Sequence, residues 1–183
     1  MKPRAAILAL VLLLASVAPA AERFGITIRS GYFQPSDRFF RTIYGGGISW
    51  QAEGAVAFWR GFELWAGAGL FSKDGHMIPT GEPTSVWLVP AGGGLRYVLR
   101  AGKVRIYGGA GILRDFFRES NFIGRISWGR WAPQFEAGSR ILLRKPWFLD
   151  LHFQYSSCRM KPADLEFNVG GFSIAAGVGV RFE

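Results

Sequence analysis

The residues best suited to catalysis lie together in one segment near the C-terminal end of the chain. His152 follows Asp150 by two positions and precedes Ser156 and Ser157. A serine nucleophile needs a base such as histidine within hydrogen-bond reach, and an acid commonly orients that base. The second histidine, His76, has no evident partner in the sequence. The element that carries residues 150–157 therefore decides whether these groups can meet.

Other kinds of site find little support in the residue types. The single cysteine, Cys158, cannot form an intramolecular disulfide, and with two histidines it falls short of a conventional zinc site. Its thiol either has no role or forms an intermolecular cross-link. The glycine-rich segments at 92–94 and 108–111 lack the Lys-Ser/Thr pair of phosphate-binding loops. We expect neither a metal ion nor a cofactor.

Length and composition limit the class of protein. A chain of 183 residues is typical of one domain, and a content of 49% hydrophobic against 19% charged residues excludes disorder. The net charge is +9, and much of this excess lies in Arg60, Arg100, Lys103, Arg144 and Lys145. Because these cations form no continuous basic face, we expect no nucleic-acid partner and assign them to the lipid head groups of the inner leaflet.

Residues 1–20 have the three parts of a secretory signal peptide. Lys2 and Arg4 form a basic start, residues 7–17 are apolar, and Ala18-Pro19-Ala20 is a cleavage site. This apolar run is much shorter than the roughly 20 residues of a spanning helix, which argues against a membrane anchor. We therefore expect an exported chain whose remaining domain covers residues 21–183.

Hydrophobic residues alternate with small or polar ones along most of this domain, with the period of two that is typical of β-strands. In the last segment Phe172, Ile174 and Val178 alternate with serine, alanine and glycine. The pattern predicts strands at about residues 24–32, 43–57, 62–72, 86–99, 104–113, 125–142, 147–156 and 171–182.

The predicted connections alternate between short and long. Short turns are centred on residues 59–61, 100–103 and 144–146, and long loops cover about 34–42, 73–84, 114–124 and 157–168. An even number of antiparallel strands with short turns at one end is typical of outer-membrane barrels. A soluble sandwich or lipocalin-like barrel has similar strands. The chemistry of the two strand faces must therefore distinguish a membrane barrel from a soluble one.

The two faces differ in chemistry. One face carries most of the charges and is expected to form a polar network inside the barrel: Arg29, Glu53, Glu63, Arg96, Arg105, Arg130, Glu136, Arg140, Asp150, His152 and Arg181. The other face is expected to meet lipid: Phe24, Ile26, Ile28, Trp87, Tyr97, Leu149, Leu151, Phe153, Tyr155, Phe172, Ile174, Val178, Val180 and Phe182.

Two observations favour a membrane barrel over a soluble one. Glycine and alanine crowd the charged face, which suits the narrow interior of an eight-stranded barrel. Trp87 and Tyr97 lie ten residues apart on one apolar face, a distance that spans about 25 Å in a tilted strand and matches the apolar band of such barrels. Phe172 and Phe182 have the same spacing. The predicted fold is an all-β, eight-stranded, antiparallel up-and-down transmembrane β-barrel.

Two prolines interrupt this pattern. Pro90 and Pro133 lie within predicted strands, where each removes a hydrogen bond from the ladder, and we predict a β-bulge at each. A bulge near Gly129 also lets Trp128 and Trp131 both face outward, whereas strict alternation turns Trp128 inward.

The first strand and loop carry a family resemblance. The segments Gly31-Tyr32-Phe33-Gln34-Pro35-Ser36-Asp37 and Phe40-Arg41-Thr42-Ile43-Tyr44-Gly45 resemble a stretch found in the small outer-membrane β-barrel family, which includes OmpA-, OmpX- and OmpW-type domains. The final strand resembles the assembly signal of these barrels, although Glu183 follows the usual terminal aromatic residue. The resemblance implies a bacterial outer-membrane location, with outer-membrane lipids and the barrel assembly machinery as partners.

The expected function is a structural or surface-interaction role, with four long extracellular loops and a lumen plugged by paired charges. One alternative is a lipid A-modifying hydrolase or acyltransferase. In deacylase barrels a His-x-Ser pattern faces outward, whereas here Gln154 follows His152 and the histidine falls on the inward face. Another alternative is a narrow channel for small apolar solutes, as in OmpW-type barrels. We predict that the chain is not an enzyme.

Overall fold

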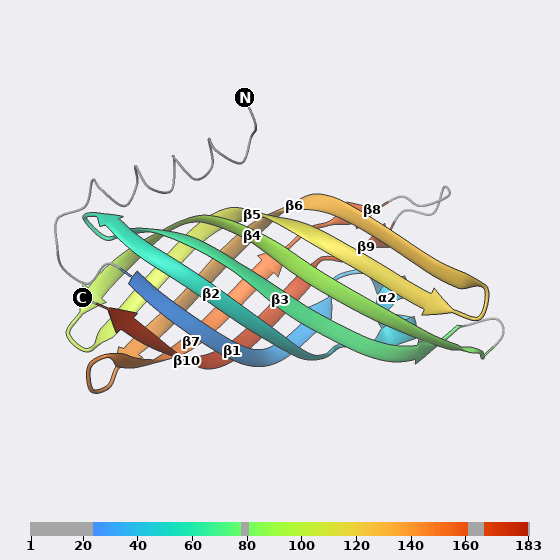
Figure 1. The fold of residues 1–183 in the computed structure, drawn as a ribbon, viewed down its shortest axis with the longest axis horizontal. Helices are drawn as coiled ribbons and strands as arrows, with labels where there is room; N and C mark the ends of the chain where they lie inside the picture. Colours follow the sequence, from blue (N-terminus) through green and yellow to red (C-terminus); the bar gives the residue numbers. More distant parts are fainter. Residues whose placement is uncertain (1–23, 78–80, 161–166, 183) are drawn as a thin grey trace, which may run out of the picture.

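The computed structural model describes residues 24–77, 81–160 and 167–182, and it forms an antiparallel β-barrel (Figure 1). The ring consists of β1 (Phe24–Pro35), β2 (Gly47–Trp59), β3 (Phe62–His76), β4 (Pro83–Ala101), β5 (Val104–Asn121), β6 (Gly124–Leu142), β7 (Trp147–Ser156) and β10 (Gly171–Phe182). Helix α2 (Arg38–Tyr44) follows β1, and a small sheet of β8 (Arg159–Met160) and β9 (Phe167–Asn168) precedes β10. The predicted fold class is confirmed, while the predicted signal peptide lies outside the described residues.

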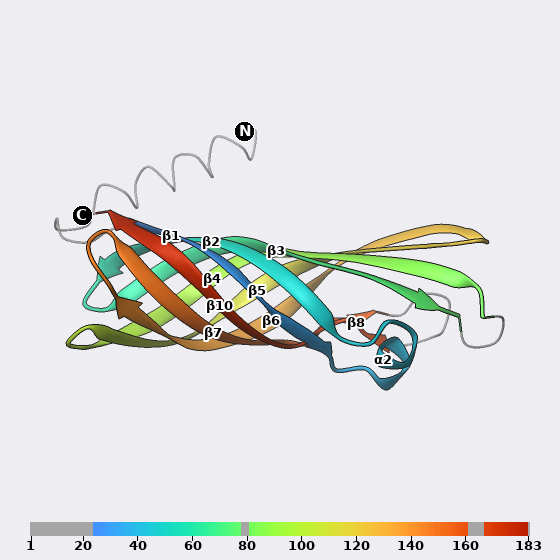
Figure 2. The same cartoon turned by 90° about the horizontal axis from the view of Figure 1, so that it is seen from below.

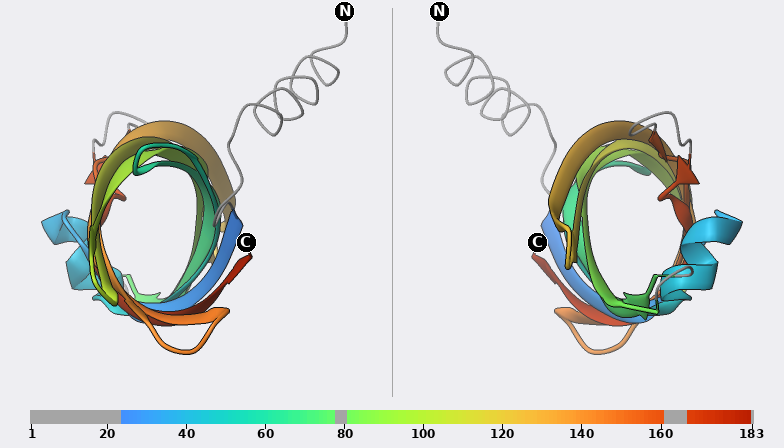
Figure 3. Two further views of the ribbon diagram at one scale, coloured as in Figure 1. Left: turned by 90° about the vertical axis from the view of Figure 1, so that its left-hand side faces the viewer. Right: turned by 90° about the vertical axis from the view of Figure 1, so that its right-hand side faces the viewer.

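Each strand pairs with its neighbours in the chain, and β1 closes the ring by pairing with β10 (Figure 3). A path perpendicular to the strands that starts at Phe24 returns to β1 at Gln34, ten residues further along. With eight strands this offset corresponds to a strand tilt of roughly 40°. Within the described residues, no helix is long and apolar enough to cross a membrane.

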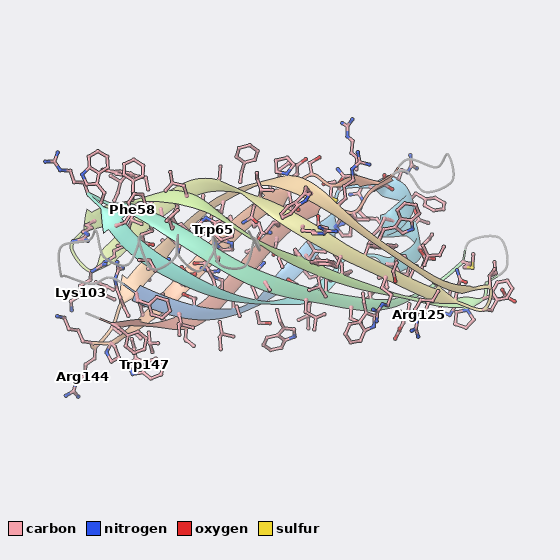
Figure 4. All side chains as sticks on the ribbon, turned by 45° about the horizontal axis from the view of Figure 1, so that its top comes forward. Phe58, Trp65, Lys103, Arg125, Arg144 and Trp147 are labelled. Atoms are coloured by element: carbon pink, nitrogen blue, oxygen red, sulfur yellow. The ribbon has the colours of Figure 1, made fainter. Side chains whose placement is uncertain are left out.

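The ends of the barrel differ in shape. The β2–β3, β4–β5 and β6–β7 connections are short and lie at the same end as the start of β1 and the end of β10 (Figure 1). Lys103 and Arg144 project from this end beside Trp147, and Arg125 projects from the other (Figure 4). Helix α2 and the long β3–β4 and β5–β6 hairpins lie at the opposite end (Figure 2).

The first long loop contains a helix, where a loop at about residues 34–42 and then a strand were predicted. The sequence pattern placed a strand from residue 43, whereas β2 begins at Gly47 and residues 38–44 form α2. The Asp37 side chain accepts a hydrogen bond from the Phe40 amide and caps the helix, and Gly45 ends it with a φ of 67°. Phe40 and Tyr44 are four positions apart, so they share the buried face of the helix.

The predicted loop at residues 114–124 is also wrong, because most of it is strand. β5 continues to Asn121 and β6 begins at Gly124, and the Asn121 side chain accepts hydrogen bonds from the Ile123 and Gly124 amides. The hairpin continues past the end of β7, whose last pair with β6 joins Ser156 to Gln134. The loop predicted at 73–84 shortens in the same way, since β3 runs to His76 and β4 begins at Pro83.

Neither proline forms the predicted bulge, because the β4–β5 and β5–β6 registers are continuous across the described residues. The β3–β4 ladder loses its pairing opposite Pro90 and resumes in the same register at Phe71 and Leu88. The carbonyl of Pro133 accepts a hydrogen bond from the Ser157 amide at 3.3 Å, beside the last β6–β7 pair. A residue's N–H and C=O point to the same side of a strand, so the missing N–H of Pro133 lies where the ladder ends.

Trp128 reaches solvent by a different route from the predicted bulge. In an unbroken register it pairs with the buried Phe117 and lies on the inward face. Its side chain is nevertheless 44% exposed, because β6 has no β7 partner at this height. Trp131, on the outward face, is 61% exposed.

We predict that Gly177→Ala destabilises the barrel by about 1–3 kcal/mol, because a Cβ at this position overlaps the carbonyl oxygen of Ile28 and lies 2.7 Å from Cγ of Arg29. The free energy of unfolding is measured by urea titration in detergent micelles with tryptophan fluorescence. The matched control is Gly108→Ala, where the nearest atom, the Glu136 carbonyl oxygen, is 3.8 Å from the new Cβ. We expect a change within about 0.5 kcal/mol for this control, and equal losses in both variants would contradict the packing argument.

Candidate functional site

Charged side chains from seven strands meet inside the barrel in what we call the lumen charge network. All are buried, and each was assigned to the inward face from the sequence: Arg29, Glu53, Glu63, Arg96, Glu136, Arg140, Asp150, His152 and Arg181. The strands supply these groups because inward positions recur at every second residue. Four arginines face four carboxylates, so the formal charges balance.

Arg96 is the centre of the network. Its Nη2 lies 2.6 Å from Oε1 of Glu53, its Nε 3.0 Å from Oε2 of Glu63, and its Nη1 3.5 Å from Oε1 of Glu136. These three carboxylates come from β2, β3 and β6. One guanidinium therefore ties together strands on opposite sides of the ring.

The other three arginines complete the pairing. Arg29 contacts Glu53 at 2.9 Å and also pairs with Asp150. Arg140 and Arg181 both contact Glu63, at 2.9 and 3.1 Å. Buried charges of this kind are tolerated because each has an opposite charge and directed hydrogen bonds close by.

Tyr107 is a member of the network that the search for charged residues missed. Its hydroxyl donates to Oδ1 of Asp150 at 3.0 Å and lies 2.9 Å from Nδ1 of His152. The guanidinium carbons of Arg96 and Arg140 lie 4.9 and 5.0 Å from the centre of its ring. Tyr107 is two residues from the inward Arg105, so its place in the alternation carried the signal.

Glycine makes room for these long side chains. A Cβ at Gly109 would lie 2.5 Å from Cβ of Arg96 on the neighbouring strand. Arg96 can therefore cross the interior because the neighbouring strand has no side chain at this position.

A neutral polar layer lies above the charges. The amide Nε2 of Gln51 donates to Gln154 at 3.2 Å and approaches the Ser173 hydroxyl at 3.5 Å. Two cavities of about 30 Å³ adjoin this layer. Each has room for about one or two water molecules.

The end of the barrel beside α2 is filled by apolar side chains, which we call the mouth cluster. Its buried members are Phe33, Phe40, Tyr44, Phe71, Val86, Leu88, Phe117, Ala132, Cys158 and Val169. The rings of Phe33 and Phe71 meet edge to face at 5.0 Å. The Tyr44 hydroxyl lies 3.0 Å from the Thr84 hydroxyl, which ties α2 to β4. The sequence pattern did not predict this cluster, because members such as Phe40, Phe117 and Cys158 lie in segments that were predicted to be loops.

Two of the predicted inward charges lie outside the pairs described above. Arg105 is buried, as predicted. Arg130 is exposed, so its assignment to the polar network is wrong. Arg130 is opposite Asp115 in the β5–β6 register. This position lies beyond the last β6–β7 pair, toward the hairpin tip, where β7 no longer covers that face.

The residues predicted to face outward are all exposed except Val180, which is half-buried.

The candidate catalytic segment does not form a nucleophile–base pair. His152 is 1% exposed and its nearest acidic neighbours are Asp150, through Tyr107, and Glu136, whose Oε2 lies 4.0 Å from Nε2 of the histidine. Ser156 is inward but four residues further along β7, about 13 Å away along the strand. This arrangement favours a structural role for His152.

Cys158 is a free thiol and is completely buried in the mouth cluster. Burial, together with the negative charge of Asp115, raises the pKa of the Cys158 thiol to about 12. A protonated, covered thiol is a poor nucleophile, so the structure favours an unreactive cysteine over the intermolecular cross-link.

We predict that Arg96→Ala lowers the free energy of unfolding by about 3–5 kcal/mol, because it leaves Glu53, Glu63 and Glu136 buried with one cation fewer. Urea titration in micelles provides the measurement. The exposed turn residue Arg144 supplies the control, and we expect Arg144→Ala to change stability by no more than about 0.5 kcal/mol. Adding Glu53→Ala to Arg96→Ala should cost less than the sum of the two single changes, and additive losses would argue against a coupled network.

Several solved structures share this fold. The chain superposes on neisserial surface protein A with a TM-score of 0.67 and 15% identity, covering 87% of this chain and 97% of that one. For the outer membrane protein OprG of Pseudomonas aeruginosa the TM-score is 0.70 at 14% identity, with 91% and 98% covered. Ail, the attachment invasion locus protein of Yersinia pestis, gives 0.56 at 13% identity, with 89% and 100% covered.

No curated protein sequence matches the chain. The outward apolar surface and the closed ring, together with a match to a family of outer-membrane proteins, place the protein in the bacterial outer membrane. The model of the outer membrane protein beta-barrel domain family matches residues 5–182, and the chain therefore belongs to that family.

Proposed function

We propose that the protein is a non-conducting outer-membrane barrel with a structural or surface-interaction role. The observation that carries the proposal is the filling of the interior in successive layers. Paired charges occupy the half nearest the short turns, amides lie above them, and the mouth cluster fills the other end. The described cavities along this axis are of the size of water molecules, which leaves little space for a solute.

The proposed orientation places the short turns in the periplasm and α2 with the long hairpins outside the cell. The β5–β6 hairpin then presents its tip, where Phe122 and Ile123 are 62% and 74% exposed, well beyond the membrane. Exposed apolar residues at the end of a rigid hairpin suit contact with another surface. This surface, together with the exposed side of α2, is the part of the molecule that we assign to interaction.

The two alternative functions receive less support. A lipid A-modifying enzyme needs its catalytic groups where acyl chains can reach them, whereas His152 is enclosed by the lumen charge network. A channel for apolar solutes needs a continuous path, whereas Phe33, Phe71 and Phe117 pack across the mouth. We therefore advance neither as a second candidate.

We predict that the refolded protein gives no steady single-channel currents in planar bilayers bathed in concentrated KCl. A variant in which a Gly-Ser linker replaces residues 38–44 removes Phe40 and Tyr44 but leaves the lumen charge network in place. We expect this variant to remain silent as well, because the charges beneath still fill the lumen. Steady current steps from the parent protein would contradict the proposal.

The orientation is tested by a peptide tag inserted between Phe122 and Ile123 and, as a matched control, by the same tag inserted after Gly102 in the β4–β5 turn. Antibody should label intact cells that carry the first insertion, because the hairpin tip lies outside. Cells with the control insertion should be labelled only after the outer membrane is permeabilised. The reverse pattern would invert the proposed topology.

A further inference from the structure

A cationic groove lies on the lipid-facing side of β4, β5 and β6, near the end that carries the long hairpins. It has a volume of about 360 Å³, and its lining includes Trp87, Arg114, Phe116, Arg118, Ser127 and Gly129. We call it the arginine groove. Nothing in the lumen charge network or the mouth cluster involves its two arginines.

The strand register builds the groove. Arg114 pairs with Trp131, Phe116 with Gly129, and Arg118 with Ser127, so all these positions lie on the outward face. Gly129 leaves a hollow between the larger side chains, and a Cβ there would lie 3.4 Å from Nε of Arg114.

The guanidinium of Arg114 is held over aromatic rings. Its Cζ lies 5.4 Å from the centre of the Phe116 ring and 5.7 Å from that of the Trp131 ring. Both distances are within the range of cation–π contacts. The aromatic residues thus orient this cation without neutralising it.

The positive charge of the groove has no counter-ion in the part of the chain that the structure describes: no carboxylate there pairs with Arg114 or Arg118. The two acids in this stretch of β5 belong to the other face. Asp115 is 2% exposed inside the barrel, and Glu119 accepts a hydrogen bond from the buried Thr84. Among the described residues, these two outward arginines therefore have no carboxylate partner.

Their height in the membrane follows from the register. The path from Phe24 that runs perpendicular to the strands rises about 3 Å along the barrel axis at each strand and reaches β5 at Ala110. Continuing along β5 places Arg114 about 22 Å and Arg118 about 32 Å above Phe24. Phe24 stacks on Phe182 on the outward face at the short-turn end, and we take this aromatic pair as the lower boundary of the apolar band, which is about 25 Å tall in such barrels. Arg114 consequently lies at the outer edge of the hydrocarbon, and Arg118 lies in the head-group layer.

We propose that the arginine groove binds the phosphorylated head group of an outer-leaflet lipid. Arginine forms two-pronged hydrogen bonds with phosphate, and near hydrocarbon these are stronger than in water. The two arginines are about 13 Å apart along β5, so a lipid with two phosphates can engage both, while Ser127 adds a hydroxyl donor. Val89 and Phe116 pair with each other between the heights of the two arginines and form the apolar wall of the groove. The proposal rests on the orientation given above, which the tag insertions test separately.

Native mass spectrometry of the refolded chain in dodecyl maltoside, an uncharged detergent, tests the proposal with diphosphoryl lipid A as the probe. The test variant combines Arg114→Gln with Arg118→Gln. The control combines Arg100→Gln with Arg144→Gln, which removes the same charge from exposed positions at the other end of the barrel. We expect the test variant to bind lipid A at least about tenfold more weakly than the parent, and the control to bind it like the parent.

Two further binding experiments identify which chemical group of the lipid is recognised. Dephosphorylated lipid A should bind the parent as weakly as diphosphoryl lipid A binds the test variant, and inorganic phosphate should not displace the bound lipid. Equal binding by parent and test variant, or equal losses in test variant and control, would overturn the proposal, as would tight binding of dephosphorylated lipid A. If phosphate alone displaced the lipid, the groove would be a free-phosphate site and the lipid assignment would fail.

Folding is checked separately by heat-modifiable gel migration. Arg118 is exposed and forms no ion pair among the described residues, so Arg118→Gln alone should fold normally even if the double variant does not. It should still weaken lipid A binding, and unchanged binding in this folded variant would also count against the groove.

Discussion

A backbone amide or carbonyl in hydrocarbon has no water to bond to, so a sheet that crosses a membrane must pair all of its edges with each other. The β1–β10 pair meets that requirement here, and the other features follow from it. Closure with eight strands and an offset of ten residues fixes the tilt and leaves an interior only wide enough for side chains. That narrow interior in turn determines which residues can face inward.

Inside the ring, each long charged side chain needs both an opposite charge and a small residue beside it. Arg96 reaches carboxylates on three other strands because Gly109 on the adjacent strand offers no side chain in its path. The low dielectric of such an interior penalises an unpaired charge and strengthens a paired one. The paired charges and the glycine-rich inward faces are therefore two consequences of the same geometric limit.

The barrel is unequal at its two ends, and so is the distribution of its cations. Arg100, at the end of β4, and Arg144, in a short turn, lie at one interface, whereas Arg114 and Arg118 lie on the outward face near the other. An arginine turned toward lipid is least costly at the interface, where it can reach phosphate or water. The extended β5–β6 hairpin brings these cations to that level and carries its apolar tip beyond it.

The alternation of residue types determined most of the fold from the sequence. A period of two assigned Arg29, Glu63 and Asp150 to the inside and Ile28, Leu149 and Val178 to the outside, because each strand turns successive side chains to opposite faces. Tertiary structure alone decided three other matters: the helix at 38–44, the continuity of β5 through Arg118, and the exposure of Arg130. All three lie at the end where strands of unequal length stop at different heights. Whether a residue there is covered depends on neighbours distant in sequence, and local alternation carries no information about where those neighbours end.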